Sequence, residues 1–269
     1  AKGYMINDPV AVRLGRDRYW ISIADSDVIY YFKGLAEGLK LNARVFEPDI
    51  NILSIQGPKS EILIERMFGK EILGIKFFKH QKIKFLGKEM IIARSGWSHQ
   101  LCYEIYVDGF SYGEALWDKL FKLGNDLDVK AGCPNLIERI ESGLLSYGND
   151  INSSHTPYEA GLGKFLSSGV SESCLAFESL KNKRNPDKMI KPIQISGNPI
   201  TPITYWVDIK NASGDIVWLV SSATWSPVFE VNVAIGMVDK KFWGFNSNLF
   251  IDYSENDRRE IYIQEKFWS

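Results

Sequence analysis

The sequence predicts an α+β protein in two parts, a mixed first domain over residues 1–168 and a small antiparallel barrel or sandwich over residues 169–269. In the first part, strand-like runs rich in β-branched and aromatic residues alternate with segments whose apolar residues recur every three or four positions. From about Ser167 onward, short strand-like runs follow one another with Gly, Asn and Pro between them, which is typical of small all-β domains. The polar loop 182–188, which cannot be buried, lies near this change.

The strands of the first part are predicted from runs of β-branched and aromatic residues. They are expected over residues 10–14, 19–24, 50–56 and 101–107. A β-hairpin is expected over residues 80–95, with Leu86, Gly87 and Lys88 at its turn. These strands would form the sheet of the first domain.

Four amphipathic helices are predicted between these strands, because apolar residues recur there at helical spacing. They are expected over residues 27–41, 58–69, 112–125 and 134–148. Pro58 stands at a first-turn position, where its missing N–H does no harm, and Gly69 marks the end of that helix. In the last helix, Ile137, Ile140 and Leu144 form the expected buried stripe.

The second part contains six strand-like runs with turn residues between them. They are expected over residues 189–195, 202–209, 215–222, 229–238, 248–253 and 259–267. Their even spacing favours an antiparallel sheet that closes into a barrel or folds into a sandwich.

Composition excludes several classes of function. Lys and Arg number 32 against 33 Asp and Glu, so the net charge of -1 provides no field that would gather nucleic acid or an anionic membrane. The 3 cysteines are far apart and show no C-x-x-C spacing, which argues against a disulfide framework and a zinc site and favours a reducing, cytoplasmic compartment. No apolar run approaches the roughly 20 residues of a membrane span, and the N-terminus has no secretory pattern. The sequence is compatible with a homodimer and with a monomer.

The strand at 101–107 carries the clearest candidate site. A period of two places Cys102, Glu104 and Tyr106 on one face of the strand. The preceding turn, Ser-Gly-Trp-Ser-His, has Trp97 where a turn ordinarily has small polar residues. One interpretation is a solvent-facing strand, and the other is a ligand pocket with a carboxylate and a phenol on the same side.

Asp8 is a second candidate. It lies in Asn7-Asp8-Pro9, which is a common turn initiator, so a structural turn is one interpretation of the motif. The alternative is a buried carboxylate that faces a ligand amine.

Other motifs favour structure over chemistry. The Gly before the helix at 58–69 lacks the spacing of a phosphate-binding loop, which argues against a nucleotide site. Thr156 and Glu159 form a capping box. The three histidines, His80, His99 and His155, show no spacing that would bind a metal on one element. No G-x-S-x-G elbow is present.

Several segments, in this order, resemble the tetrahydrofolate-dependent aminomethyltransferase superfamily. They are SIQGP (54–58), ARSGW with YEIYV (93–107), NLIERIESGLLSYGNDI (135–151), TPYEAGLG (156–163) and SSATWSP with NVAIGMV (221–238). The resemblance spans nearly the whole chain. It implies a folate-binding α/β domain of aminomethyltransferase type over 1–168, tetrahydrofolate as cofactor, and a C-terminal antiparallel β-barrel. It also implies a further N-terminal portion that contributes to the pocket, and the chain is expected to be incomplete there.

Within the superfamily, the sequence departs from the glycine-cleavage enzymes. Trp97 replaces the tyrosine of their R-T-G-Y-T-G-E-D-G motif, SHQLC replaces its Glu-Asp-Gly run, and Asn135 stands near the arginine of their G-A-R-D motif. The combination of INDP, RSGW and CPNLIERIESGLLSYGND is similar to the dimethylsulfoniopropionate demethylases. That resemblance implies transfer of a methyl group from a small sulfonium substrate to tetrahydrofolate.

The resemblance also implies roles for five residues. Asp8 matches the acidic residue that faces the folate reaction centre and is the expected catalytic group. Glu104 matches the glutamate that hydrogen-bonds the pterin. Trp97, Tyr106 and Phe78 match pocket positions, with Tyr106 expected to contact both folate and donor. Two alternatives stay open, an enzyme that uses an N-methyl or aminomethyl donor and a non-catalytic folate-binding module, although the K-G-C-Y-x-G-Q-E signature of such modules is missing.

The implied chemistry suits a site without a nucleophile or a metal. A sulfonium is an activated methyl donor, because its leaving group is a neutral thioether, and N5 of the folate is the nucleophile. The protein then has to align N5, the methyl carbon and the sulfur, an effect that reaches about 7 to 11 kcal/mol in favourable cases. An aromatic face beside the sulfonium would add about 0.5 to 2 kcal/mol.

Overall fold

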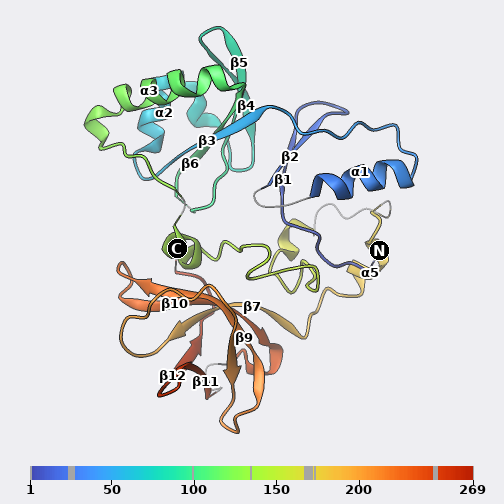
Figure 1. Cartoon of the computed structure of the whole chain (residues 1–269), viewed down its shortest axis with the longest axis vertical. Coiled ribbons are helices and arrows are strands. Elements are labelled where there is room, and N and C mark those ends of the chain that lie inside the picture. The colour runs from blue at the N-terminus through green and yellow to red at the C-terminus, as the bar shows by residue number, and fades with distance from the viewer. Residues whose placement is uncertain are drawn as a thin grey trace. The chain divides into compact units, whose positions relative to one another are not determined.

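A computed structural model describes residues 2–23, 28–98, 100–133, 135–166, 172, 174–244 and 248–268 (Figure 1). The chain divides into two compact units, one of residues 10–134 and one of residues 1–9 together with 135–269. This division by contacts differs from a boundary at residue 168, because residues 135–166 pack with the C-terminal strands. Residue 168 as the limit of a folate-binding domain stays a prediction.

The unit of residues 10–134 is built on a four-stranded antiparallel sheet in the order β3-β6-β5-β4 (Figure 1). Its strands are β3 (Ile50–Gln56), β4 (His80–Phe85), β5 (Lys88–Ala93) and β6 (Cys102–Asp108). The predicted hairpin is confirmed as β4 and β5. Leu86 and Gly87 at its turn have φ angles of 49° and 81°, the positive values that a two-residue hairpin turn requires.

Helices cover one face of this sheet. They are α2 (Ser60–Phe68) and α3 (Gly113–Leu123). The 3-10 turn Lys70–Gly74 follows α2 and leads to β4, Phe110–Tyr112 leads from β6 to α3, and Asn125–Leu127 follows α3. Tyr103 and Ile105 of β6 are fully buried in the core that the sheet shares with Leu63, Ile64 and other helical residues. This burial fixes which side of β6 faces the helices.

The other face of the sheet is partly covered by a small hairpin, β1 (Val10–Arg13) and β2 (Tyr19–Ser22). Val12 of β1 packs in a cluster with Ile91 and Tyr106 of the sheet. The predicted strands at 10–14 and 19–24 are confirmed in this hairpin. Helix α1 (Val28–Gly38) follows it and confirms the predicted helix, whose first residue, Asp27, lies outside the described residues.

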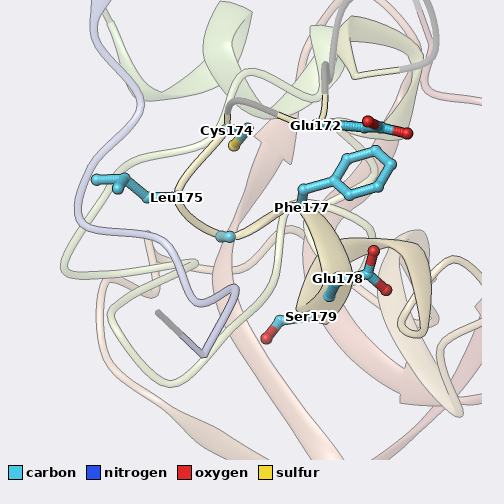
Figure 2. Close-up of a pocket in the computed structure, with 7 residues that line it drawn as sticks. Glu172, Cys174, Leu175, Phe177, Glu178 and Ser179 are labelled. Carbon is cyan, nitrogen blue, oxygen red and sulfur yellow. The ribbon is translucent and has the colours of Figure 1, made fainter.

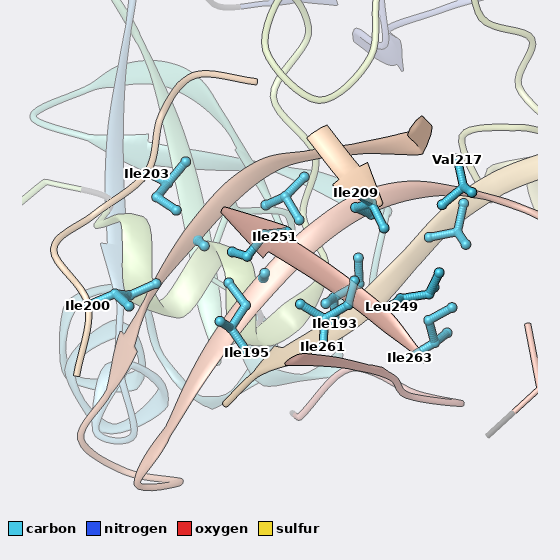
Figure 3. Close-up of a cluster of buried hydrophobic side chains, with 14 residues drawn as sticks. Ile193, Ile195, Ile200, Ile203, Ile209, Val217, Leu249, Ile251, Ile261 and Ile263 are labelled. Carbon is cyan, nitrogen blue, oxygen red and sulfur yellow. The ribbon is translucent and has the colours of Figure 1, made fainter. Parts of the chain in front are cut away.

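The second unit contains a closed antiparallel barrel in the order β10-β7-β12-β11-β8-β9. Its strands are β7 (Lys188–Ile195), β8 (Val207–Lys210), β9 (Ile216–Ser226), β10 (Val231–Asp239), β11 (Leu249–Ser254) and β12 (Asp257–Ile263). Alternate residues of these strands, such as Ile193 and Ile195 of β7 and Ile261 and Ile263 of β12, form the isoleucine-rich interior (Figure 3). The α+β class and the C-terminal antiparallel barrel are therefore confirmed.

The remaining elements of this unit are short. They are α4 (Leu136–Ser142), α5 (Phe177–Lys181) and the 3-10 turns Gly163–Phe165 and Lys240–Phe242. The predicted helix over 134–148 is wrong in length, because Gly143 adopts a left-handed φ of 67° and ends α4. Thr156 and Glu159 do exchange the hydrogen bonds of a capping box, at 2.6 and 3.2 Å, but a series of turns follows them instead of a helix. Among the described residues, no helix has the length and apolar character that a membrane crossing requires.

Candidate functional site

The face of the four-stranded sheet opposite α2 and α3 carries the predicted site residues of β6. Strands β3 and β6 pair in a register that places Ser54 beside Glu104 and Gln56 beside Cys102. Because side chains alternate along a strand, these four residues lie on the face opposite the buried Tyr103. The predicted sharing of a face by Cys102, Glu104 and Tyr106 follows from the same alternation. The face is polar at this end and apolar where the β1–β2 hairpin covers it.

Tyr106 lies at the covered end. Its side chain is 2% exposed, and its ring stacks on Trp20 of β2 with ring centroids 5.4 Å apart and an interplanar angle of 23°. Burial raises the pKa of the Tyr106 phenol, and the nearby hydroxyl of Ser22 opposes this rise. No described residue lies in hydrogen-bond geometry with the phenol oxygen. The phenol stays neutral at physiological pH. Trp20, which the sequence patterns did not single out, therefore fixes the position of this ring.

Glu104 lies at the polar end and is half-buried. Its Oε2 accepts a hydrogen bond from the hydroxyl of Ser95. Among the described residues, Ser95 is the hydrogen-bond partner of the Glu104 carboxylate, and it uses Oε2. Oε1 can therefore accept a hydrogen bond from a ligand. Sequence reasoning missed Ser95, whose signal is its place two residues beyond Ala93, the register partner of Glu104.

Cys102 is a structural thiol in this arrangement. Its Sγ lies 3.4 Å from the Ser54 hydroxyl. Burial raises the pKa of the Cys102 thiol to about 11, and the charge of Glu104 adds to this. The thiol is therefore protonated at neutral pH and a poor nucleophile.

The turn between β5 and β6 carries Trp97 and packs closely on β6. At Gly96 an added Cβ would lie 2.1 Å from Cys102 Sγ and 2.6 Å from Cys102 Cβ, so this position has no room for a side chain. Trp97, the next residue, is 40% exposed. The adjoining His99 lies outside the described residues.

Gly96→Ala is expected to destabilise the protein by about 1 to 3 kcal/mol, the usual cost of forcing a side chain into a filled site. Urea unfolding measures the change in the free energy of unfolding. Gly15→Ala is the matched control, because a Cβ at Gly15 would meet no atom within 4 Å. Equal stabilities of the two variants would contradict the close packing of this turn.

Phe78 lies beside the base of the same turn. Its backbone N–H donates to the carbonyl of Arg94 at 2.9 Å, and the N–H of Arg94 donates to Lys79 at 2.9 Å. The Phe78 side chain is 48% exposed and packs on Phe77, with ring centroids 4.2 Å apart. Phe78 and Trp97 are thus exposed aromatic residues on segments that the backbone ties together through Arg94.

Asp8 belongs to the other compact unit. The segment before it is anchored by Met5, which is buried and donates its N–H to the carbonyl of His155 at 2.9 Å. Asp8 itself is an exposed residue, and its N–H donates to Asn7 Oδ1 at 2.8 Å. The Asp8 side chain therefore differs from the buried carboxylate of the alternative interpretation, and its place at a folate reaction centre stays a prediction.

Partial desolvation nevertheless raises the pKa of the Asp8 carboxyl, and the charge of Asp150 adds to this rise. The hydrogen bond of its own backbone N–H opposes the shift. The Tyr147 phenol is another neighbour, whose pKa is raised by burial and by the charge of Asp8. The environment of Asp8 therefore favours proton uptake more than that of an ordinary surface aspartate.

Asp150, whose charge acts on Asp8, belongs to a buried ion pair in the same unit. Arg139 of α4 contacts Asp150 at 2.5 Å, with side chains 3% and 0% exposed. Asp150 also accepts hydrogen bonds from the hydroxyls of Ser221 and Ser222 at 2.6 and 2.7 Å and from the N–H of Ser146 at 2.8 Å. The pair thus joins α4 and the loop after it to strand β9 of the barrel.

Asn135 has a structural task in this unit. Its Oδ1 accepts the N–H of Glu138 at 2.9 Å, so Asn135 caps helix α4. Asn135, which the resemblance places near the arginine of the G-A-R-D motif, is therefore a helix cap in this chain.

A surface hollow of about 450 Å³ lies elsewhere in the barrel-containing unit (Figure 2). It is lined by Glu172, Cys174, Leu175, Ala176, Phe177, Glu178 and Ser179. None of the predicted site residues lines it. Phe78, Trp97, Glu104 and Tyr106 instead belong to the unit of residues 10–134, and Asp8 belongs to the other.

Comparison with known proteins places this architecture in a family. The solved structure of the glycine cleavage system aminomethyltransferase T from Bartonella henselae matches with a TM-score of 0.80 and 18% identity, over 100% of this chain and 73% of that one, which shows a shared fold. The dimethylsulfoniopropionate demethylase of Ruegeria pomeroyi is 43% identical over 99% of this chain and 72% of its own length. The aminomethyltransferase of Caldanaerobacter subterraneus is 24% identical over 99% and 72%. Residues 1–169 match the family model described as the GCVT N-terminal domain, and the chain belongs to that family.

Proposed function

We propose that this chain is a tetrahydrofolate-dependent demethylase that transfers a methyl group from dimethylsulfoniopropionate to tetrahydrofolate. The products are methylmercaptopropionate and 5-methyltetrahydrofolate. The observation that carries the proposal is the 43% identity with the Ruegeria pomeroyi demethylase, against 24% for the aminomethyltransferases of Caldanaerobacter subterraneus and Flavobacterium psychrophilum. The cysteine pattern supports a reducing, cytoplasmic location as part of this proposal.

Glu104 fits the task of holding the pterin. Its half-buried carboxylate has Oε1 available, and carboxylate oxygens accept hydrogen bonds from amino and ring N–H groups. Tyr106, held by Trp20, gives the apolar end of the same sheet face a fixed shape. These residues orient the methyl acceptor, and orientation makes a large contribution to a transfer between two bound molecules.

Trp97 and Phe78 fit the task of binding a cation. Both aromatic side chains are exposed, at 40% and 48%, so a positively charged donor can reach their faces. An aromatic ring attracts a sulfonium without supplying a full negative charge. A full negative charge would stabilise the sulfonium in the ground state more than in the transition state, where the positive charge is leaving the sulfur.

Asp8 fits the task of a proton acceptor. During transfer the bond from the methyl carbon to sulfur breaks, the bond from that carbon to N5 forms, and the electron pair of the broken bond leaves with the neutral thioether. N5 then carries a proton and a positive charge. Asp8, whose raised pKa brings it closer to neutral pH than an ordinary aspartate, accepts that proton.

The test is methyl transfer from dimethylsulfoniopropionate to tetrahydrofolate, followed as 5-methyltetrahydrofolate. Because this chain spans 72% of the Ruegeria pomeroyi protein, the assay is also run on the chain extended with the additional residues of that relative. Turnover with the sulfonium and none with sarcosine supports the proposal. Turnover with sarcosine alone would favour an N-methyl donor, and folate binding without turnover on any donor would favour a binding module.

Trp97→Ala is expected to lower kcat/KM for the sulfonium donor by up to about 30-fold, the equivalent of a lost cation–π contact, and to leave folate affinity within about twofold. Steady-state kinetics and folate titration measure the two quantities separately. Trp117→Ala is the matched control, because Trp117 is an equally exposed tryptophan, at 41%, on helix α3. Equal losses of turnover and folate affinity in Trp97→Ala would assign the ring to the folate.

A further inference from the structure

The turn that carries Trp97 is held to the sheet at three successive residues. Arg94 exchanges backbone hydrogen bonds with the segment before β4, donating to Lys79 and accepting from Phe78, each at 2.9 Å. Gly96 packs against Cys102 so closely that a Cβ has no space. Ser95 lies between these two anchors and is 3% exposed. Its side chain is therefore enclosed by a backbone that has little freedom to move.

The Ser95 hydroxyl is directed at one atom. It donates a hydrogen bond to Oε2 of Glu104. A serine hydroxyl has a single proton, and this proton is committed to the carboxylate. Because one partner is an anion, the bond belongs to the stronger, charge-assisted class.

The consequence for Glu104 is a fixed carboxylate plane. A glutamate on an open sheet face turns freely about its last torsion angle, whose energy profile is broad. The bond from Ser95 anchors one oxygen, so the other oxygen has a defined direction. A ligand that donates to Oε1 then does not have to order the carboxylate when it binds.

We infer that Ser95 is a positioning residue, which orients Glu104 to accept the N–H groups of the pterin. The inference rests on the proposed function and goes beyond it, because it couples the two sides of the site. Ser95 and Trp97 belong to one turn, so the group that orients the acceptor and the ring that faces the donor share a rigid backbone.

The experiment is titration of tetrahydrofolate together with steady-state kinetics on Ser95→Ala. We expect the dissociation constant and KM for tetrahydrofolate to rise about tenfold, which is the range for losing a hydrogen bond to a charged group, and kcat to stay within about twofold. Ser95→Thr, which keeps the hydroxyl, should restore the affinity. Thermal melting shows whether the variants are folded. If Ser95→Ala is unfolded, Ser95→Cys replaces it, because a thiol keeps the volume and is only a weak donor.

Ser98→Ala is the matched control. Ser98 is a buried serine of the same turn, 3% exposed, whose hydroxyl has no hydrogen-bond partner among the described residues. Its replacement should leave folate affinity unchanged. A purely structural role of buried serines in this turn would instead affect both positions alike.

Glu104→Gln separates failure of this inference from failure of the proposed function. If Glu104→Gln weakens folate binding and Ser95→Ala does not, Ser95 has no positioning role and the assignment of Glu104 stands. If neither variant changes folate binding, both the inference and the proposed folate site on this sheet face are overturned. A loss in Ser95→Ala that Ser95→Thr does not restore would also overturn the inference.

Discussion

Asp8→Asn should lower kcat/KM for methyl transfer by about 10²- to 10⁴-fold at neutral pH, the range for removing a general base. Asparagine keeps the size and the polarity of the side chain but cannot accept the proton that leaves N5. The backbone hydrogen bond from Asp8 to Asn7 does not depend on the carboxylate, so the local turn is retained. Comparison of kcat/KM for the two proteins at pH 7.5 tests this expectation.

The pH profile provides an independent test of the same role. Asp8 acts in its ionised form, so activity falls as the pH drops through its pKa. Partial desolvation and the charge of Asp150 raise that pKa, and the acid limb should therefore lie at higher pH than for an ordinary aspartate. The limb should disappear in Asp8→Asn, and the residual activity should be flat in this range. A limb that persists in the variant would belong to another group.

Asp8→Asn should lower activity without lowering the stability of the protein. A carboxyl whose pKa is higher in the folded state binds its proton more tightly there than in the unfolded chain. Stability therefore falls as the pH rises through that pKa, and the ionised Asp8 costs some stability at neutral pH. Asparagine removes this cost, so the variant should melt no earlier than the parent protein. Asp128→Asn, at an exposed position with a left-handed φ of 59° that asparagine tolerates, is the control and should change neither property.

Local patterns were sufficient to predict most elements of the fold. The β-branched run over 50–56 and the turn at Leu86 and Gly87 specify strands and a hairpin through interactions between near neighbours. The predicted helix over 134–148 was too long, because the apolar stripe continues to Leu144 while the backbone reverses its φ at Gly143. A glycine inside a helical pattern costs only about 1 kcal/mol, so periodicity alone does not show whether it ends the helix.

The candidate site was only partly predictable, because local sequence patterns do not encode contacts between separate elements. The common face of Glu104 and Tyr106 follows from alternation in one strand. The stacking of Trp20 on Tyr106 depends on how a separate hairpin packs on the sheet, which no local pattern encodes. Likewise, Arg139 lies in an amphipathic helix, where a charged residue usually faces solvent, and its burial depends on Asp150.

Arg139→Met should destabilise the protein by about 3 to 5 kcal/mol, the largest stability loss that we expect from a single substitution in this chain. Methionine is similar in length and fills most of the volume, so the loss comes mainly from the charge. Asp150 would stay fully buried, with hydrogen bonds from Ser221 and Ser222 but without the guanidinium at 2.5 Å. Urea unfolding at pH 7 measures the change in the free energy of unfolding.

The control is an ion pair of the same charge type at the surface. Lys82 and Glu89 contact each other at 2.6 Å with side chains 67% and 52% exposed, so Lys82→Ala should cost at most about 1 kcal/mol. Adding Asp150→Asn to Arg139→Met should recover part of the loss, because the amide oxygen still accepts hydrogen bonds and no charge is left buried. If Arg139→Met cost no more than Lys82→Ala, the pair would not hold α4 to the barrel. The anchoring of the segment at Met5, which packs with Ile140 of α4, would then depend on apolar contacts alone.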